Sequence, residues 1–237
     1  MLLIDEGLSM KQTIKFSSES TLAWQCFEQL QNEIINGTLK PGEKLKIGPI
    51  KNRFSIGQSP VREALSRLAS CGLVEIENNK GFRVSTISEA DIRDTYHIFT
   101  LIENMALAMA IERGDDTWES SIVATLHSLG LIETSTTTHS YNVWALRNYN
   151  FHIALIAACG SPSLLHMRHY IYMKFDRYCK IAYQLDGHPL FLNHNEHIQL
   201  AQAVLARETS HAQALMTYHI NGAIEAVITN MKENNLI

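Results

Sequence analysis

Three histidines are spaced so that helical packing could bring them together in one metal site. His152 follows Asn148 by four residues, and in a helix such a pair projects from the same side. His197 and His219 would lie close together if they belong to consecutive antiparallel helices. Three imidazoles with an oxygen ligand suit zinc, nickel or another borderline divalent ion. The alternative is that these are ordinary surface or core histidines.

A second group of residues could bind nucleic acid. Residues 59–68 (SPVREALSRL) open with Ser59, a favoured N-cap residue, and Pro60, which suits the first helical position. The apolar residues recur at helical spacing on one face: Val61, Ala64, Leu65 and Leu68. Arg62 and Arg67 lie off this face. A helix with a buried stripe and exposed arginines suits insertion into a DNA groove, although an ordinary surface helix would look similar.

The charge of the chain is unevenly divided. The 237 residues are 46% hydrophobic and 19% charged, enough to bury a core, and their net charge is −4. Residues 20–86 carry nine Lys or Arg against six Asp or Glu, whereas residues 87–237 carry nine against fifteen and all eleven histidines. A positive small domain joined to an acidic, histidine-rich larger one predicts two separate roles.

The chain lacks the marks of a secreted or membrane protein. No apolar run reaches the ~18–20 residues that a membrane span requires, and the acidic start is unlike a signal peptide. We predict that residues 1–19 form a flexible leader. Four cysteines within apolar helical patterns are expected to be reduced core residues: Cys26, Cys71, Cys159 and Cys179. We therefore expect a cytoplasmic protein without a membrane partner.

The elements around residues 59–68 predict a winged helix-turn-helix. Helices are expected over residues 20–36 and about 49–54, followed by a tight turn over 55–57 and the helix that Ser59 begins. Two short alternating strands, 73–76 and 81–84, are joined across residues 77–80 and predict the hairpin that forms the wing.

After Thr86 the pattern contains helices alone. They are expected over residues 88–113, 116–130, 140–159, 162–185, 190–206 and 208–232, the first beginning like a capping box at Ser88. The predicted fold class is mainly α. A winged helix-turn-helix domain (residues 20–86) precedes an all-helical bundle (residues 87–237).

Several stretches resemble the GntR family of bacterial transcription regulators: residues 36–45 (NGTLKPGEKL), 59–65 (SPVREAL), 72–74 (GLV) and 81–84 (GFRV). The helical part resembles the ligand-sensing domain of the FadR-type (FCD) subfamily. Residues 113–119 (RGDDTWE) are similar to regulators of carbon starvation and of dicarboxylate or amino-acid catabolism. The resemblance implies a DNA-binding regulator rather than an enzyme, commonly a repressor, which binds a palindromic double-stranded operator as a homodimer.

The resemblance also implies which residues meet DNA. Arg62 and Ser59 match residues of the family's recognition helix, and Lys51 and Arg67 are expected to be phosphate contacts or solvated charges. Gln58 stands where the family usually has arginine. Because glutamine suits adenine better than guanine, the operator sequence of the family is not expected to transfer to this chain.

FCD domains often carry an Asp-x-x-x-His pair on one helix and two histidines on the last two helices. Asn148, His152, His197 and His219 match these positions, with Asn148 in place of aspartate. An amide oxygen can coordinate a metal but brings no negative charge, so a weaker site is expected. The implied cofactor is a divalent ion, zinc or nickel.

The implied effector is a small organic acid or an amino-acid-derived metabolite bound near the metal. Many FCD domains place an arginine four residues before the first-helix glutamate, here Glu103, but this chain has Phe99 at that position. Three other arginines could supply the carboxylate clamp: Arg147, Arg168 and Arg177. Tyr96, Tyr172 and Tyr178 could line the same cavity or pack as core.

Two alternative functions remain open. The bundle could serve only for dimerisation, without metal or effector. The histidines could instead hold a catalytic ion, although the sequence lacks the motifs HExxH and GxSxG, a phosphate loop and a dinucleotide fingerprint. Such an enzyme would need a nearby general base, and Glu196 is expected to point around the helix, away from His197.

Overall fold

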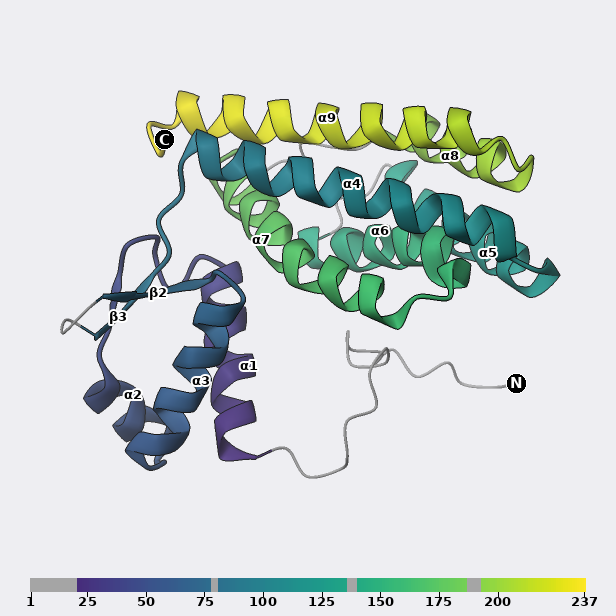
Figure 1. Cartoon of the computed structure of the whole chain (residues 1–237). Helices are drawn as coiled ribbons and strands as arrows, with labels where there is room; N and C mark the ends of the chain where they lie inside the picture. The colour runs from purple at the N-terminus through teal and green to yellow at the C-terminus, as the bar shows by residue number, and fades with distance from the viewer. Residues whose placement is uncertain (1–20, 78–80, 136–139, 187–192) are drawn as a thin grey trace.

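The computed structural model describes residues 21–77, 81–135, 140–186 and 193–237, which form a small domain and a larger helical domain (Figure 1). The described residues contain nine α-helices, one short 3-10 helix and three strands. The predicted mainly α fold class is confirmed. The predicted leader, residues 1–19, lies outside the described residues. So does most of each predicted turn over residues 77–80, 134–138 and 186–189.

The small domain is a winged helix-turn-helix. Its helices are α1 (Leu22–Ile35), α2 (Ile47–Phe54) and α3 (Gln58–Ser70). Its antiparallel sheet has the order β1 (Lys44–Leu45), β3 (Gly81–Val84), β2 (Val74–Glu77), with Val74 opposite Val84 and Lys44 opposite Arg83. Strand β1 was not predicted, because two residues are too few to show an alternating pattern.

The start of α3 differs from the sequence prediction. Gly57, in an extended conformation, is the N-cap residue and Gln58 begins the helix, so the prediction of Ser59 as N-cap was wrong. Pro60 is tolerated in third position because no N–H group of the first turn has an intrahelical partner. The predicted apolar face is confirmed by four fully buried side chains: Val61, Ala64, Leu65 and Leu68.

Helix α4 is a central helix of the larger domain. In chain order the helices of this domain are α4 (Glu89–Arg113), α5 (Asp116–Glu133), α6 (Tyr141–Ile156), η1 (Ala157–Cys159), α7 (Pro162–Asp186), α8 (His194–Leu205) and α9 (Thr209–Glu233). Helix α4 packs against α6, α7 and α9 (Figure 1). The Ser88 hydroxyl caps α4 by accepting a 3.1 Å hydrogen bond from the Asp91 N–H, as predicted. The four cysteines are buried and free, as expected.

Helix α7 joins the two domains. The Met173 side chain is buried in the core of the small domain, alongside residues of α1 and α3. The Gln184 amide donates to the backbone oxygen of Asn36, at the end of α1, at 2.6 Å. On the connection between β3 and α4, the backbone oxygen of Ser85 accepts a 2.7 Å hydrogen bond from Arg177. The position of the small domain is therefore coupled to α7.

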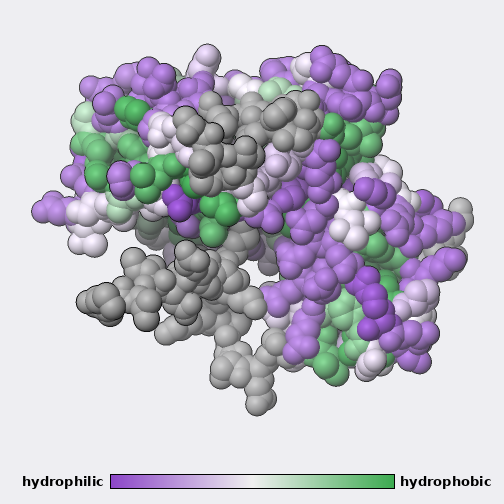
Figure 2. Space-filling model, turned by 180° about the vertical axis from the view of Figure 1, so that it is seen from behind, coloured by the Kyte–Doolittle hydropathy of each residue, from purple (hydrophilic) through white to green (hydrophobic). Residues whose placement is uncertain are grey.

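The face of the molecule opposite to the view of Figure 1 is mainly polar. Seen from behind, the small domain carries mostly hydrophilic residues, and hydrophobic patches are scattered among polar ones over the helical domain (Figure 2). Among the described residues, no helix combines the length and apolarity needed to cross a membrane.

Candidate DNA-binding surface and metal–effector site

The first two turns of α3 present polar side chains to solvent. Gln58, Ser59 and Arg62 are exposed, opposite the buried apolar face. With the Gln58 amide oxygen turned toward Arg62, it accepts from Nε at 3.2 Å and from Nη2 at 3.3 Å. Arg62 forms no ion pair with any described residue. Both side chains are exposed, so their mutual hydrogen bonds can be exchanged for contacts with a base edge or a phosphate.

The two other residues proposed for DNA contact differ in their surroundings. Lys51 is exposed near the end of α2. Arg67, near the end of α3, pairs with Glu63 at 2.9 Å and lies 5.8 Å from the ring centre of Trp24 on α1. Arg67 is therefore already engaged within the domain, whereas Lys51 is available.

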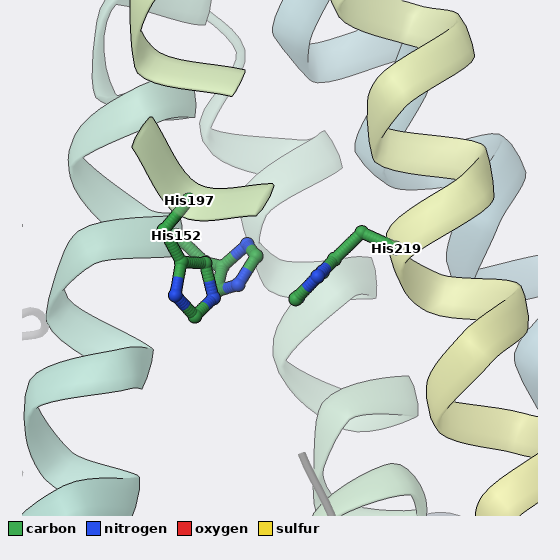
Figure 3. A group of neighbouring side chains, drawn as sticks. All are labelled: His152, His197 and His219. Atoms are coloured by element: carbon green, nitrogen blue, oxygen red, sulfur yellow. The ribbon is translucent and has the colours of Figure 1, made fainter. Parts of the chain in front are cut away.

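The three predicted histidines converge from different helices. His152 lies on α6, His197 on α8 and His219 on α9, and their rings face one another (Figure 3). One nitrogen of each lies within 4.8 Å of the others. His152 and His197 are buried and His219 is nearly so. Asn148 belongs to the same group, with its amide nitrogen 3.3 Å from His197 Nε2.

Burial and mutual repulsion favour the neutral forms of His152 and His197. The pKa of His152 lies well below its usual 6.5 because burial disfavours the cation and His219 and His197 repel it. Burial also lowers the pKa of His197, although its hydrogen bond to Glu133 acts in the opposite direction. Neutral imidazoles have the lone pairs that a metal ion requires.

Two carboxylates orient the outer nitrogens of the cluster. Glu133 Oε2 lies 3.0 Å from His197 Nδ1, and Glu196 Oε2 lies 2.7 Å from His219 Nδ1. Although burial raises the pKa of Glu133, hydrogen bonds from His197 and others hold it below its usual value. Such carboxylate–imidazole contacts direct the other ring nitrogen inward, which is the arrangement seen around protein metal sites.

Neither carboxylate was predicted from the sequence. Glu133 lies at the end of α5, and nothing in its local sequence relates it to His197. Glu196 was expected to point around its helix, away from His197, yet its carboxylate lies at the cluster, where it contacts His219 on the neighbouring helix. The spacing of Glu196 and His219 on consecutive helices was the one signal that could have suggested this contact.

A narrow cavity adjoins the cluster. Helices α4, α6, α7 and α9 enclose about 40 Å³, room for about three water molecules. His152, His219 and Asn148 lie on its wall. The rest of the wall is mostly aromatic or aliphatic and includes Phe99, Tyr141, Trp144, Tyr172, Phe175 and Ile220. The cavity can therefore admit a slender ligand directly beside the histidines.

Of the three candidate arginines, Arg168 alone lines this cavity. Its Nε donates a 2.7 Å hydrogen bond to Glu103, and both side chains are at most 1% exposed. The guanidinium lies between the rings of Phe99, Tyr149 and Tyr172, 5.2–5.5 Å from their centres. Nη1 has no hydrogen-bond partner among the described residues, and such a buried donor is suited to a carboxylate ligand.

The remaining effector candidates are divided between the cavity wall and other places in the molecule. Arg147 donates to the Ser128 backbone oxygen at 2.6 Å, and Arg177 faces the domain junction. Tyr96 and Tyr178 are buried outside the cavity wall, where Tyr96 contacts Cys179 and Tyr178 donates to Asp91. Phe99 and Tyr172 do line the cavity.

Comparison with known proteins gives one consistent result. Residues 22–84 match the family model described as bacterial regulatory proteins, gntR family, and residues 94–222 match the FCD domain. The HTH-type transcriptional repressor GlaR of Escherichia coli (strain K12) is 36% identical over 212 residues, covering 88% of this chain and 96% of GlaR. The regulator BphR of Paraburkholderia xenovorans (strain LB400) is 30% identical over 226 residues, covering 94% of this chain and 92% of BphR.

A solved structure shows the same fold. Escherichia coli McbR/YncC superimposes with a TM-score of 0.71 at 20% identity, covering 89% of this chain and 99% of that one.

Proposed function

The chain belongs to the GntR family of transcription regulators and carries an FCD domain, and we propose that it is a repressor that a small acid releases from its operator. DNA binding and transcription regulation follow from the family and its relatives. Membership of this family also argues against the metalloenzyme alternative, because the matched family and the relatives are transcription regulators. The observation that carries the proposal is that histidines and the buried Arg168 meet on the wall of one cavity.

The residues of the cluster fit a divalent ion. Nitrogens bound to zinc at 2.0–2.1 Å stand about 3.4 Å apart in a tetrahedron, and side-chain rotation covers the difference from 4.8 Å. His152, His197 and His219 would hold zinc or nickel, with the Asn148 amide turned so that its oxygen faces the ion. A bound ion would supply positive charge that attracts a carboxylate.

Arg168 would orient the acid from the other side. Its guanidinium is held by Glu103 and by the three surrounding rings, so it is already in place before a ligand enters. A carboxylate that reaches Nη1 would satisfy a donor which the described residues leave unpaired.

Helix α7 would transmit binding to DNA. Arg168 and Tyr172 face the cavity, whereas Met173 and Arg177 hold the small domain. Because the cavity is narrow, a ligand larger than a few water molecules must displace its walls. A ligand that favours the displaced position of α7 would change the relative placement of two DNA-binding domains and weaken operator binding.

The homodimer that a palindromic operator requires would form through α4. Three large apolar side chains lie exposed on this helix at spacings of three and four residues: Ile98, Leu101 and Met105. Such a stripe is suited to a self-complementary contact with a second copy. We therefore expect Leu101→Glu to yield monomers in sedimentation and to weaken operator binding. The control variant Val123→Glu, at an exposed position of α5, should remain a dimer and bind the operator like wild type.

Fluorescence anisotropy with a DNA fragment from upstream of the gene tests the function. The purified protein should bind at low salt as two copies per site, and small carboxylic acids should release it when zinc or nickel is present. Failure to bind any upstream fragment would overturn the proposal. If DNA binds but elemental analysis finds no metal and no acid has an effect, the bundle serves only for dimerisation.

A further inference from the structure

The cavity contains an acidic side chain that neither the metal cluster nor Arg168 uses. Asp176 lies on α7, eight residues after Arg168, and both side chains line the cavity. Eight residues of helix rise by about 12 Å, so the two charges stand well apart along the cavity.

Among the described residues, none donates a hydrogen bond to the carboxylate of Asp176 or forms an ion pair with it. Lys180, one turn further along α7, is the nearest candidate, but its ammonium contacts the Asn142 side chain and lies 4.4 Å from the ring centre of Tyr141. Burial raises the pKa of Asp176 to about 6, and Lys180 only partly opposes this.

The surroundings of Asp176 would favour a cation. Burial raises the pKa of Tyr141 on α6 and of Tyr172 on α7, and the nearby charge of Asp176 raises both further. Asp176 is only half-buried, but a carboxylate that aromatic side chains partly shield from water still gains from an opposite charge. Aromatic rings also attract a cation through their faces. Arg168 does not fill this role, because Glu103 already pairs with it.

We propose that the effector is a slender amino acid whose ammonium group pairs with Asp176 while its carboxylate lies at the Arg168 and histidine end. The inference rests on the proposed function and names its ligand class. The ~12 Å rise between Arg168 and Asp176, less the reach of each contact, calls for several carbons between the amine and the carboxylate. An unbranched ω-amino acid has this shape and suits the narrow cavity.

Calorimetric titration of the zinc-loaded protein tests the ligand class. The probes are ω-amino acids of three to six carbons, with the monocarboxylates and dicarboxylates of equal length. The best amino acid should bind about 10–100-fold more tightly than its monocarboxylate, as expected for a buried charge-assisted hydrogen bond. The Asp176→Asn variant should bring the two affinities within about threefold, whereas Asp94→Asn on the exposed face of α4 should leave the preference intact.

The outcomes separate the two proposals. If acids without an amine bind the wild-type protein as tightly as the amino acids and release it from DNA, the ammonium site is wrong and the acid-responsive repressor stands. If no probe binds or changes DNA affinity, both are overturned. Circular dichroism of Asp176→Asn, with retained binding of the monocarboxylate, shows that the variant remains folded.

Discussion

Arg177 on α7 donates a 2.7 Å hydrogen bond to the backbone oxygen of Ser85, and this contact links the helix that walls the cavity to the strand that ends the wing. Asp176, the preceding residue, faces the cavity. Two adjacent residues of α7 thus face different places: Asp176 faces the cavity and Arg177 faces the domain junction. A movement of α7 that accommodates a ligand must therefore also act on the domain junction.

Replacing Arg177 should uncouple the sites. Arg177→Met removes a buried hydrogen bond from a charged donor, and we expect stability to fall by about 1.5–3 kcal/mol in urea unfolding. The affinity of the variant for ligand should stay within about threefold of wild type. Saturating ligand should nevertheless release a much smaller fraction of the bound DNA from the variant than from the wild-type protein. Arg147→Met is the matched control, because it removes a comparable bond to Ser128 within the bundle. Equal loss of DNA release in both variants would contradict a special role for Arg177.

The buried pair of Glu103 and Arg168 should respond non-additively to substitution. The two side chains approach to 2.6 Å and are almost completely buried. Arg168→Met or Glu103→Met alone should cost about 3–5 kcal/mol, because each leaves an uncompensated buried charge. The double variant should recover most of this loss and yet fail to bind acids. Additive costs in a double-mutant cycle would show that the pair does not act as a unit.

Asp176→Asn should stabilise the ligand-free protein at neutral pH. The pKa of the Asp176 carboxyl group is 3.8 in the unfolded chain and about 6 in the folded chain. Because the folded protein holds this proton more tightly, wild-type stability falls as the pH rises between these two values. The cost is fully present at pH 7, where the variant should gain about 1–3 kcal/mol. At pH 5 the gain should be about half as large. Urea unfolding at both pH values measures it, and a gain independent of pH would show that the ionisation of Asp176 is not its cause.

The sequence predicted most of the fold because its signals are local. Helical periodicity and the Ser88 cap required only neighbouring residues, and the buried face of α3 followed from spacing alone. The misplaced N-cap of α3 shows the limit of such reasoning. Ser59 and Pro60 could be the N-cap and the first helical residue, or equally well the second and third helical residues. The turn after α2 decides between these two arrangements.

The site was only partly predictable. His152, His197 and His219 could be grouped because consecutive helices pack side by side, and the resemblance to FCD domains favoured the same three. The roles of Glu133 and Asp176 could not be foreseen, since each depends on which face of a long helix turns inward. The sequence offered three arginines for one role, and only packing brings Arg168 to the cavity.

Arg62 should contribute more to operator binding than Arg67. Arg62→Ala removes an exposed guanidinium that forms no ion pair with a described residue, and it should weaken binding by about 1–3 kcal/mol. Arg67→Ala should cost less, because Glu63 and Trp24 already engage its guanidinium. Anisotropy titrations at several salt concentrations compare them. A larger loss for Arg67→Ala would mean that the helix approaches DNA through its C-terminal half.

Asn148→Asp should strengthen the metal site. The amide of Asn148 lies beside His197, and an aspartate there would add a negative charge where an ion would sit. We expect zinc or nickel affinity to rise by about 10–100-fold in competition with a chelator. Asn150→Asp adds the same charge on the exposed side of α6 and should change affinity by less than threefold. Equal affinities for Asn148→Asp and wild type would place Asn148 outside the coordination sphere and leave the three histidines to hold the ion without it.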